Sequence, residues 1–502
     1  CNAACKADGV CGAWGPPVYC FKHSISQFRN AVFFFMTTKL AGVSSQKPPK
    51  NYHKNDRQKP TNVSDLWYNP GEVMDVPQYR ERVADDILDL KLESFGATLI
   101  VGPKGCGKTT TAKQKARSVV EFQDEDRRDE YLAVANTQPS RLLLGEKPRL
   151  FDEWQDAPKI WGAIRKDVDD KQENGSYILT GSTSKQVTTP HTGTQRISTL
   201  KMYPMSLWES GESSGTVSLN ALFENPDAFE GCHSSLQMDD LIFAICRGGW
   251  PRAVNNKTPR AKLAVAKDLF HQISGSDISS IDNVRRNALW AEAILRSYSR
   301  NICTLASKKT IYADVSSEST IANSTFNDYV EALEKLFIID DVAAWNPSIR
   351  SKTAIRASSK RNLIDPSIAA AALGVNPDYF NEDFKTLGFL FECLCIRDLR
   401  IYSSARSGRV SYYRDRYGLE ADAVLHLEDG QYALIEMKLG TNGIDEGAQH
   451  LCRIEALTEE YNTDHKQTPL RLPRLKIVIT GTEYGYRRED GVFVIPIGCL
   501  KD

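Results

Sequence analysis

The sequence lacks both an excess of charge of one sign and a hydrophobic run of membrane-spanning length near its start. Its 502 residues include 63 lysines and arginines against 64 aspartates and glutamates, so the global charge favours no class of partner. The apolar run at residues 31–36 is far shorter than the roughly 20 residues that span a bilayer. We therefore expect no membrane partner, and only local charge clusters bear on nucleic-acid binding.

The twelve cysteines show no common metal-binding spacing. Four of them, Cys1, Cys5, Cys11 and Cys20, lie in the first twenty residues without a zinc pattern, and the scatter argues against a disulfide scaffold. Cys106 lies inside a candidate phosphate-binding loop, which fits a reducing compartment. We expect a cytoplasmic protein.

The N-terminal part has no regular hydrophobic period. The chain begins with Cys1, and we interpret residues 1–35 as a truncated or mis-started segment, with Met36 as the expected start. Residues 43–63 are rich in Ser, Lys, Asn and Pro, which is typical of a solvated linker. We therefore predict that residues 1–70 are disordered or mis-started. A secretory signal is a minor alternative, because no small-residue cleavage site followed by a disulfide-rich domain is present.

The next part of the chain predicts an α/β domain with a parallel sheet. Residues 97–102 form an expected buried strand that ends in glycine, and residues 110–120 form an expected helix. Further strands are predicted at 131–134, 148–152 and 177–181, with helical stretches such as 157–172 between them. This alternation is typical of a parallel sheet, and the chain length predicts two or three domains.

Residues 102–109 fit the phosphate-binding pattern G-x-x-x-x-G-K-T. Glycines let backbone N–H groups point inward around a phosphate at the N-terminus of the following helix. Lys108 is predicted to reach the β and γ phosphates of ATP, and Thr109 to bind Mg²⁺ through its hydroxyl. The predicted loop contacts are Gly102, Pro103, Lys104, Gly105, Cys106, Gly107, Lys108, Thr109 and Thr110. An ordinary glycine turn is the alternative.

Hydrolysis also needs a carboxylate at the end of a neighbouring strand, and the strand predicted at 148–152 supplies two. Asp152 is predicted to hold Mg²⁺ through water, and Glu153 to orient and deprotonate the attacking water. An exposed pair of acids at a strand end is the alternative. Thr180 or Ser182, at the end of the next strand, is a candidate sensor of the γ phosphate, with turn formation as the alternative.

Arg196 follows a glycine-containing loop and is a candidate arginine finger. Its guanidinium would stabilise phosphoryl charge in its own or a neighbouring subunit. A plain surface charge is the alternative.

From residue 238 onward, long amphipathic stretches dominate and predict a helical module. The helix expected at 324–337, followed by apolar residues, suits a winged-helix-like region. DNA recognition by this helix and simple helix packing remain alternatives. Residues 348–361 add a basic patch without acids that is compatible with phosphate contacts: Arg350, Lys352, Arg356, Lys360 and Arg361.

Near the C-terminus, two alternating strands on either side of residues 428–430 resemble the D…E-x-K core of restriction-type nucleases. A three-residue loop with a left-handed Gly430 pairs Leu427 with residue 431 and keeps both apolar sets on one face, whereas a two-residue turn separates them. This register places Asp422 opposite Glu436, with Lys438 diagonal. Opposed carboxylates repel, so we predict compensation by Lys438, by Mg²⁺ or Mn²⁺, or by both. A vestigial fold with a surviving salt bridge is the alternative.

The order of these segments resembles predicted prokaryotic AAA-type P-loop ATPases that carry a C-terminal domain of unknown function. The resemblance covers about residues 75 to 460 and rests on residues 102–109, 152–155, 204–211 and 248–251. It implies an ATPase domain (71–235), a winged-helix-like region (236–347) and a small α/β domain similar to the restriction-endonuclease fold (348–502). In that fold Glu392, on an apolar helix, resembles an additional acid of the site.

We therefore expect ATP and Mg²⁺ as cofactors and ATP hydrolysis as the activity, with the nucleotide cycle acting on the attached modules. A metal-dependent DNA endonuclease and a nucleotide-switched interaction scaffold are the alternatives. DNA as a partner and homo-oligomer formation remain open at this point.

Overall fold

The computed structural model describes residues 79–181, 193–282, 284–348 and 358–502. Ser182 and most of the predicted basic patch, namely Arg350, Lys352 and Arg356, lie outside these residues, as does the predicted segment 1–70. None of the described helices combines the length and apolar character needed to cross a membrane.

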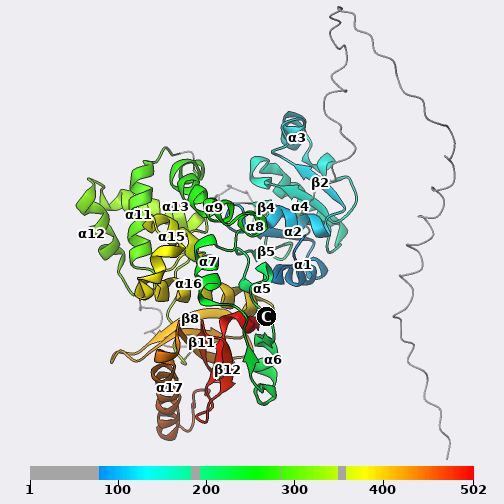
Figure 1. The fold of residues 1–502 in the computed structure, drawn as a ribbon. Helices are drawn as coiled ribbons and strands as arrows, with labels where there is room; N and C mark the ends of the chain where they lie inside the picture. Colours follow the sequence, from blue (N-terminus) through cyan, green and yellow to red (C-terminus); the bar gives the residue numbers. More distant parts are fainter. Residues whose placement is uncertain (1–78, 182–192, 283, 349–357) are drawn as a thin grey trace, which may run out of the picture. The chain divides into compact units, whose positions relative to one another are not determined.

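The first sheet is five-stranded and wholly parallel, with the order β2-β3-β4-β1-β5. Its strands are β1 (Ala97–Val101), β2 (Ser118–Glu121), β3 (Arg149–Asp152), β4 (Tyr177–Gly181) and β5 (Ile197–Lys201). The helices of this region are α1 (Val83–Ser94), α2 (Lys108–Lys115), α3 (Arg128–Thr137) and α4 (Lys159–Lys171), which Figure 1 shows around the sheet. The predicted parallel sheet and its strands at 97–102, 148–152 and 177–181 are confirmed.

Two local predictions for this region were wrong. Residues 131–134, expected as a strand, lie within α3, where Tyr131, Leu132 and Val134 pack against the core beside α4. The helix expected at 110–120 ends at Lys115, and the chain then forms β2, which pairs with β3 and buries Val120 completely. In both cases long-range packing overrides the local pattern.

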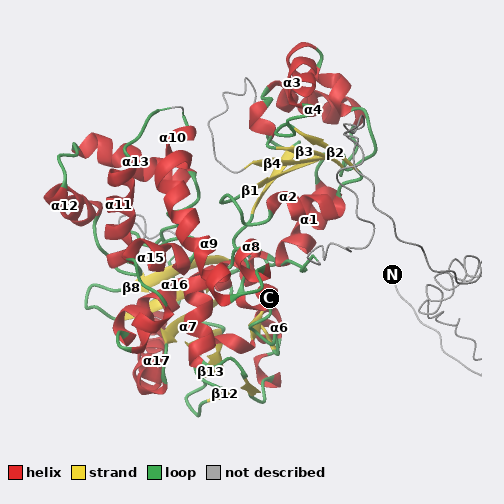
Figure 2. Ribbon diagram, turned by 45° about the horizontal axis from the view of Figure 1, so that its top comes forward, coloured by secondary structure: helices red, strands yellow, loops and turns green. Residues whose placement is uncertain are grey.

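The middle of the chain is helical, as predicted. It comprises α7 (Met238–Arg247), α8 (Pro251–Asn255), α9 (Pro259–Gln272), α10 (Ile278–Ser280), α11 (Ala288–Arg300), α12 (Lys308–Glu318), α13 (Asn323–Lys335) and α15 (Pro366–Leu373), which appear in red in Figure 2. Between α13 and α15, the described residues form isolated bridges: Ile339 with Leu363, Val342 with Lys360, and Ala344 with Tyr412. The winged-helix interpretation stays a prediction.

The second sheet is seven-stranded and mixed, with the order β7-β12-β13-β11-β10-β9-β8. Its strands are β7 (Cys232–His233), β8 (Arg409–Arg414), β9 (Glu420–His426), β10 (Tyr432–Lys438), β11 (Leu475–Thr480), β12 (Tyr484–Arg487) and β13 (Phe493–Pro496). Helix α17 (Ile444–Asp464) packs with Leu434 and Val478, whereas α16 (Phe384–Ser404) belongs to the core that contains Ile435 and Ile477. Because neighbouring residues of a strand face opposite ways, the two helices cover opposite faces of this sheet.

The segment after the first sheet pairs with the C-terminal strands. It contains α5 (Leu207–Ser210), β6 (Val217–Ser218) and α6 (Leu219–Glu224). Strand β6 pairs in parallel with β14 (Leu500–Lys501), and β7 pairs with β12. The predicted boundary at residue 235 stays a prediction, but these pairings tie residues 217–233 to the end of the chain.

Candidate nucleotide site and carboxylate cluster

The loop after β1 has the backbone conformation that a phosphate-binding loop requires. Gly102, Gly105 and Gly107 have φ values of 151°, 80° and 106°, a region that side chains other than glycine rarely adopt. At Gly102 a Cβ atom would also lie only 2.2 Å from the Met202 carbonyl oxygen. The loop leads directly into α2, which begins at Lys108. The N–H groups in the first turn of a helix are available to bind an anion, so they lie where a phosphate held by the loop would be expected.

Lys108 is buried against its own loop. Its Nζ donates to the carbonyl oxygens of Gly102 at 3.1 Å and Pro103 at 2.9 Å, and the residue is 4% exposed. Carbonyl oxygens satisfy the ammonium only in part, because they carry no net charge. A bound triphosphate would offer this ammonium stronger, charged acceptors.

Thr109 and Asp152 meet at the ends of α2 and β3. The Thr109 hydroxyl donates to Asp152 Oδ1 at 2.7 Å. The Thr180 hydroxyl, at the end of β4, also donates to Asp152 Oδ1 and accepts from the Glu153 N–H at 3.3 Å. A hydroxyl and a carboxylate in contact are hard oxygen donors, which fit the ligand preference of Mg²⁺.

Glu153 stands directly after β3 in a left-handed conformation, with φ of 53°. This conformation is uncommon for a residue with a side chain and turns the backbone sharply at the strand end. Gln155 donates its side-chain amide to Glu153 Oε2. The structure thus gathers Lys108, Thr109, Asp152 and Glu153 at the carboxyl ends of β1 and β3.

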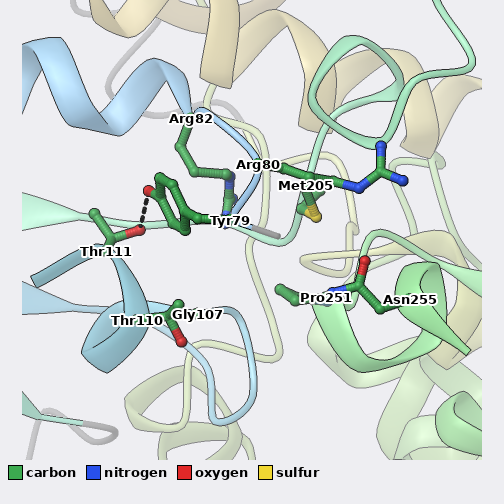
Figure 3. Close-up of a pocket in the computed structure, with 9 residues that line it drawn as sticks. All are labelled: Tyr79, Arg80, Arg82, Gly107, Thr110, Thr111, Met205, Pro251 and Asn255. Atoms are coloured by element: carbon green, nitrogen blue, oxygen red, sulfur yellow. Dashed lines mark hydrogen bonds between the residues drawn. The ribbon is translucent and has the colours of Figure 1, made fainter. Parts of the chain in front are cut away.

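A pocket of about 280 Å³ adjoins the loop and α2, and Figure 3 shows its lining. From the loop side it is lined by Gly107, Thr110 and Thr111, and from other segments by Tyr79, Arg80, Arg82, Met205, Pro251 and Asn255. Sequence reasoning missed these last six as site residues. The only signal for two of them was the pair of motifs at 204–211 and 248–251.

Tyr79 and Arg82 fix one wall of this pocket. The Tyr79 hydroxyl lies 2.9 Å from Thr111 Oγ1 and donates to Asp85, and burial raises the Tyr79 pKa above its ordinary value. Arg82 donates to the Cys106 carbonyl at 3.0 Å and pairs with Glu209 at 3.1 Å. The buried Arg82 guanidinium therefore holds the phosphate loop through its hydrogen bond to the Cys106 carbonyl.

Two further predicted residues contact groups outside the phosphate loop. Arg196 Nε lies 2.6 Å from Asp169 Oδ1, and both side chains are partly exposed. Lys104 is exposed and pairs with Asp277 of the helical region at 3.2 Å. The finger role of Arg196 stays a prediction.

The predicted register of the C-terminal hairpin is confirmed. Leu427 N–H donates to the Gln431 carbonyl at 2.9 Å, Gly430 has φ of 82°, and Ala423 pairs with Ile435, so Asp422 lies opposite Glu436. Asp422 Oδ2 also accepts from the Met437 N–H at 2.9 Å.

Lys360 and Arg361 do not belong to the predicted basic patch of phosphate contacts. The Lys360 side chain is 2% exposed, and its Nζ lies 2.7 Å from Glu392, 3.0 Å from Glu420 and 3.6 Å from Asp422. Arg361 is likewise buried and pairs with Asp341. A buried ammonium is stable only with anions around it, so these two residues are interior charges rather than phosphate contacts.

Lysines provide the charge compensation that the opposed carboxylates need. Lys438 Nζ lies 2.8 Å from Glu436 Oε2, and Lys360 forms ion pairs with Asp422 and Glu392. Burial, and then the charge of Asp422, raise the pKa of both Glu436 and Glu392 to about 8. Within the described residues, no group of three or more His, Cys, Asp or Glu side chains is arranged to hold a metal ion. The carboxylate repulsion therefore does not by itself require a cation.

Comparisons with known proteins divide the chain into three matched segments. Residues 94–210 match the AAA domain family, residues 238–379 match a domain of unknown function (DUF8612), and residues 387–500 match another domain of unknown function (DUF4143). No curated protein matches the chain.

Two solved structures show distant likeness. A Walker-type ATPase of Pyrococcus abyssi has 16% identity and a TM-score of 0.33, with 57% of this chain and 94% of that chain covered. Drosophila ORC bound to DNA has 12% identity and a TM-score of 0.17, with 62% and 97% covered. These scores are too low to support an inference. Residues 94–210 thus match an AAA domain, and the loop within them has the backbone geometry of a phosphate-binding loop.

Proposed function

We propose that this chain hydrolyses ATP with the help of Mg²⁺. The observation that carries the proposal is the contact between Thr109 and Asp152, which brings a hydroxyl and a carboxylate together beside the buried Lys108. A P-loop alone binds phosphate, whereas hydrolysis also needs a carboxylate, and Asp152 supplies one at the end of β3, which β4 separates from β1.

Each residue of the site has a distinct role in this proposal. Lys108 would bind the β and γ phosphates, and Mg²⁺ would be held by Thr109 directly and by Asp152 through water, where it would neutralise phosphate charge. Glu153 orients the attacking water and accepts its proton. Thr180, which bonds to Asp152, fixes the orientation of that carboxylate.

We assign the base and ribose to the pocket beside α2. Its walls combine a tyrosine, a methionine and a proline, Tyr79, Met205 and Pro251, which suit the flat faces of a base. Met205 belongs to the segment that matches the AAA domain, and Pro251 belongs to the segment that matches DUF8612. A nucleotide bound in this pocket would therefore contact both matched segments. We infer that the nucleotide cycle acts on the attached modules through these walls.

The test is a steady-state ATPase assay with Mg²⁺ on purified wild type, Lys108→Ala and Glu153→Gln. Both variants should lose at least about 100-fold in kcat, because each removes a group that acts on the transferred phosphoryl or the attacking water. Glu153→Gln should still bind ATP. Turnover by Lys108→Ala at the wild-type rate would overturn the proposal.

A second candidate function, metal-dependent cleavage of DNA, is favoured by the confirmed register that places Asp422 beside Glu436. The donor chemistry of these oxygens suits Mg²⁺ or Mn²⁺, but the charge facing Asp422 and Glu392 is that of Lys360. Among the described residues they are not part of a group of three or more His, Cys, Asp or Glu side chains that could hold a metal ion, so metal binding here stays a proposal.

A nicking assay with Mn²⁺ and Mg²⁺ on supercoiled DNA tests this candidate. Cleavage that disappears in both Asp422→Ala and Glu436→Ala supports it, and no cleavage of any DNA or RNA form rejects it. The ATPase assay run with and without DNA tests DNA as a partner. Tight ATP binding with very slow turnover and no cleavage would instead support a nucleotide-switched scaffold.

Two further inferences accompany the ATPase proposal. Cys106 lies buried inside the loop, and we propose a cytoplasmic setting, in which thiols stay reduced. If Arg196 acts as a finger, it acts on a neighbouring copy or after leaving Asp169, so loss of activity on dilution would indicate a homo-oligomer.

A further inference from the structure

Two loops that line the nucleotide pocket are hydrogen-bonded to each other. Met205 and Pro251 line it, and the Met205 N–H donates to the Gly249 carbonyl at 2.6 Å. The loop around Met205 continues into α5 at Leu207, and the loop around Gly249 continues into α8 at Pro251. A shift of either loop would therefore move both walls.

Both loops are anchored to carboxylates in the core. The Leu207 N–H donates to Asp398 Oδ2 at 3.0 Å, and the Gly249 N–H donates to Asp365 Oδ2 at 3.0 Å. The two aspartates come from different parts of the chain: Asp365 precedes α15, and Asp398 lies in α16. A backbone N–H held by a charged carboxylate is fixed more firmly than one held by a neutral acceptor.

One guanidinium joins the two aspartates. Arg397 Nη1 lies 2.8 Å from Asp365, and its Nη2 lies 2.7 Å from Asp398. The Arg397 side chain is 2% exposed and both aspartate side chains are fully buried. Two carboxylates without water would repel each other and lose solvation, so their shared position depends on the planar fork of Arg397.

We propose that Arg397 is a positioning residue of the nucleotide site, acting through Asp365 and Asp398 to hold the pocket walls at Met205 and Pro251. This inference rests on the proposed nucleotide binding at the P-loop. It also assigns α16, from the segment of unknown function at the end of the chain, a part in ATP recognition. The chain Leu207, Asp398, Arg397, Asp365 and Gly249 spans all three matched segments.

The proposal separates binding from chemistry. Among the described contacts, the aspartates and Arg397 reach loops that line the base pocket, whereas Lys108, Thr109 and Asp152 are held by the P-loop and by β3 and β4. Loss of Arg397 should therefore displace the base and ribose while the phosphate contacts persist. The expected signature is a raised KM for ATP with a nearly unchanged kcat.

The experiment measures KM and kcat for ATP, and the affinity for a fluorescent ATP analogue, in full-length wild type, Arg397→Met and Arg397→Lys. Arg397→Met should raise KM and the dissociation constant by about tenfold or more, with kcat within about twofold. Arg397→Lys should recover part of the affinity, because an ammonium keeps the charge but not the fork. A triple variant, Asp365→Asn with Arg397→Met and Asp398→Asn, removes the buried charges together, in case Arg397→Met does not fold. It should also raise KM, because neutral amide oxygens hold the two N–H groups less firmly than carboxylates and no guanidinium joins the two positions.

The matched control is Arg361→Met, which removes another buried arginine paired with an aspartate, Asp341; its side chain also contacts the Ala306 carbonyl and the Tyr298 hydroxyl, which belong to neither loop. It should lower thermal stability without changing KM. An unchanged KM in folded Arg397→Met and in the triple variant overturns the proposal, and so does a loss confined to kcat. If wild type neither binds nor hydrolyses ATP, the proposed function itself fails, which is a distinct result.

Discussion

A lysine ammonium needs water or anions around it, and Lys147 has neither in full. Its Nζ lies 3.2 Å from the centroid of the Tyr177 ring and has no hydrogen-bond partner among the described residues. Burial lowers its pKa from 10.5 to about 8. The charged neighbours are Asp167 and Glu173, which raise the pKa, and Lys171 and Arg149, which lower it.

The lowered pKa predicts that Lys147→Met stabilises the protein at pH 7. Below about pH 8 both folded and unfolded states carry the proton, and the folded state bears the cost of desolvating it. Between about pH 8 and 10.5 the folded state loses its proton first, so wild-type stability rises with pH relative to the variant. Urea unfolding at pH 7 and pH 10.5 should show the advantage of Lys147→Met shrinking. An equal difference at both values would contradict this account.

At the scale of elements, the hairpin between β9 and β10 determines the carboxylate cluster. A one-residue slip would turn Asp422 and Glu436 to opposite faces of the sheet. The three-residue loop avoids the slip, because Gly430 adopts a left-handed conformation and lets Leu427 pair with Gln431. The conformation of Gly430 thus determines that Asp422 and Glu436 lie opposite each other on one face.

The hairpin predicts that Gly430→Ala destabilises the protein by about 1–2 kcal/mol, the usual cost of a Cβ in the left-handed region. The nearest atoms to that Cβ belong to the exposed Arg471 side chain, which can move aside. Gly430→Asn is the matched variant and should cost less, because asparagine tolerates this conformation. Equal stability of wild type and Gly430→Ala in urea unfolding would show that the loop is not held as described.

The elements that the sequence predicted correctly carry their signal locally. A buried strand followed by a glycine loop predicted β1 and the P-loop, and two alternating strands predicted the hairpin register. The pattern around Tyr131 and Val134 predicted a strand. These residues lie in α3 instead, because a helix there packs both side chains against the core beside α4. The burial of Lys360 and the pocket walls at Tyr79 and Asn255 depend on residues far apart in the chain, and no local pattern reveals them.

At the scale of the whole molecule, the described residues from Tyr79 onward belong to a single compact unit. Strand β14 at the C-terminus pairs with β6, which follows the AAA-matched segment, and the Ser213 hydroxyl donates to the Leu500 carbonyl at 2.6 Å. Lys201 and Arg400 also meet at Asp340, which links β5 with α16. These contacts give the nucleotide site several physical routes to the rest of the protein.

Because the described residues form a single unit, we expect Leu500→Ala to lower the free energy of unfolding of this whole unit by about 2–5 kcal/mol. Leu500 is 1% exposed, and truncating its side chain leaves a cavity. Unfolding followed by tryptophan fluorescence and by circular dichroism should shift together. Lys501→Ala, at the neighbouring and more exposed position, should shift neither curve appreciably. Separate transitions for the two probes would contradict a single cooperative unit.

The most direct measurement of the central claim is a calorimetric titration of wild type and Lys108→Ala with ATP in the presence of Mg²⁺. We predict one ATP bound per chain in wild type, and a loss of at least about tenfold in affinity for Lys108→Ala, because the buried ammonium is the charged group nearest the expected phosphates. Equal affinity of the two proteins, or no binding by wild type, would contradict the assignment of this loop as the nucleotide site.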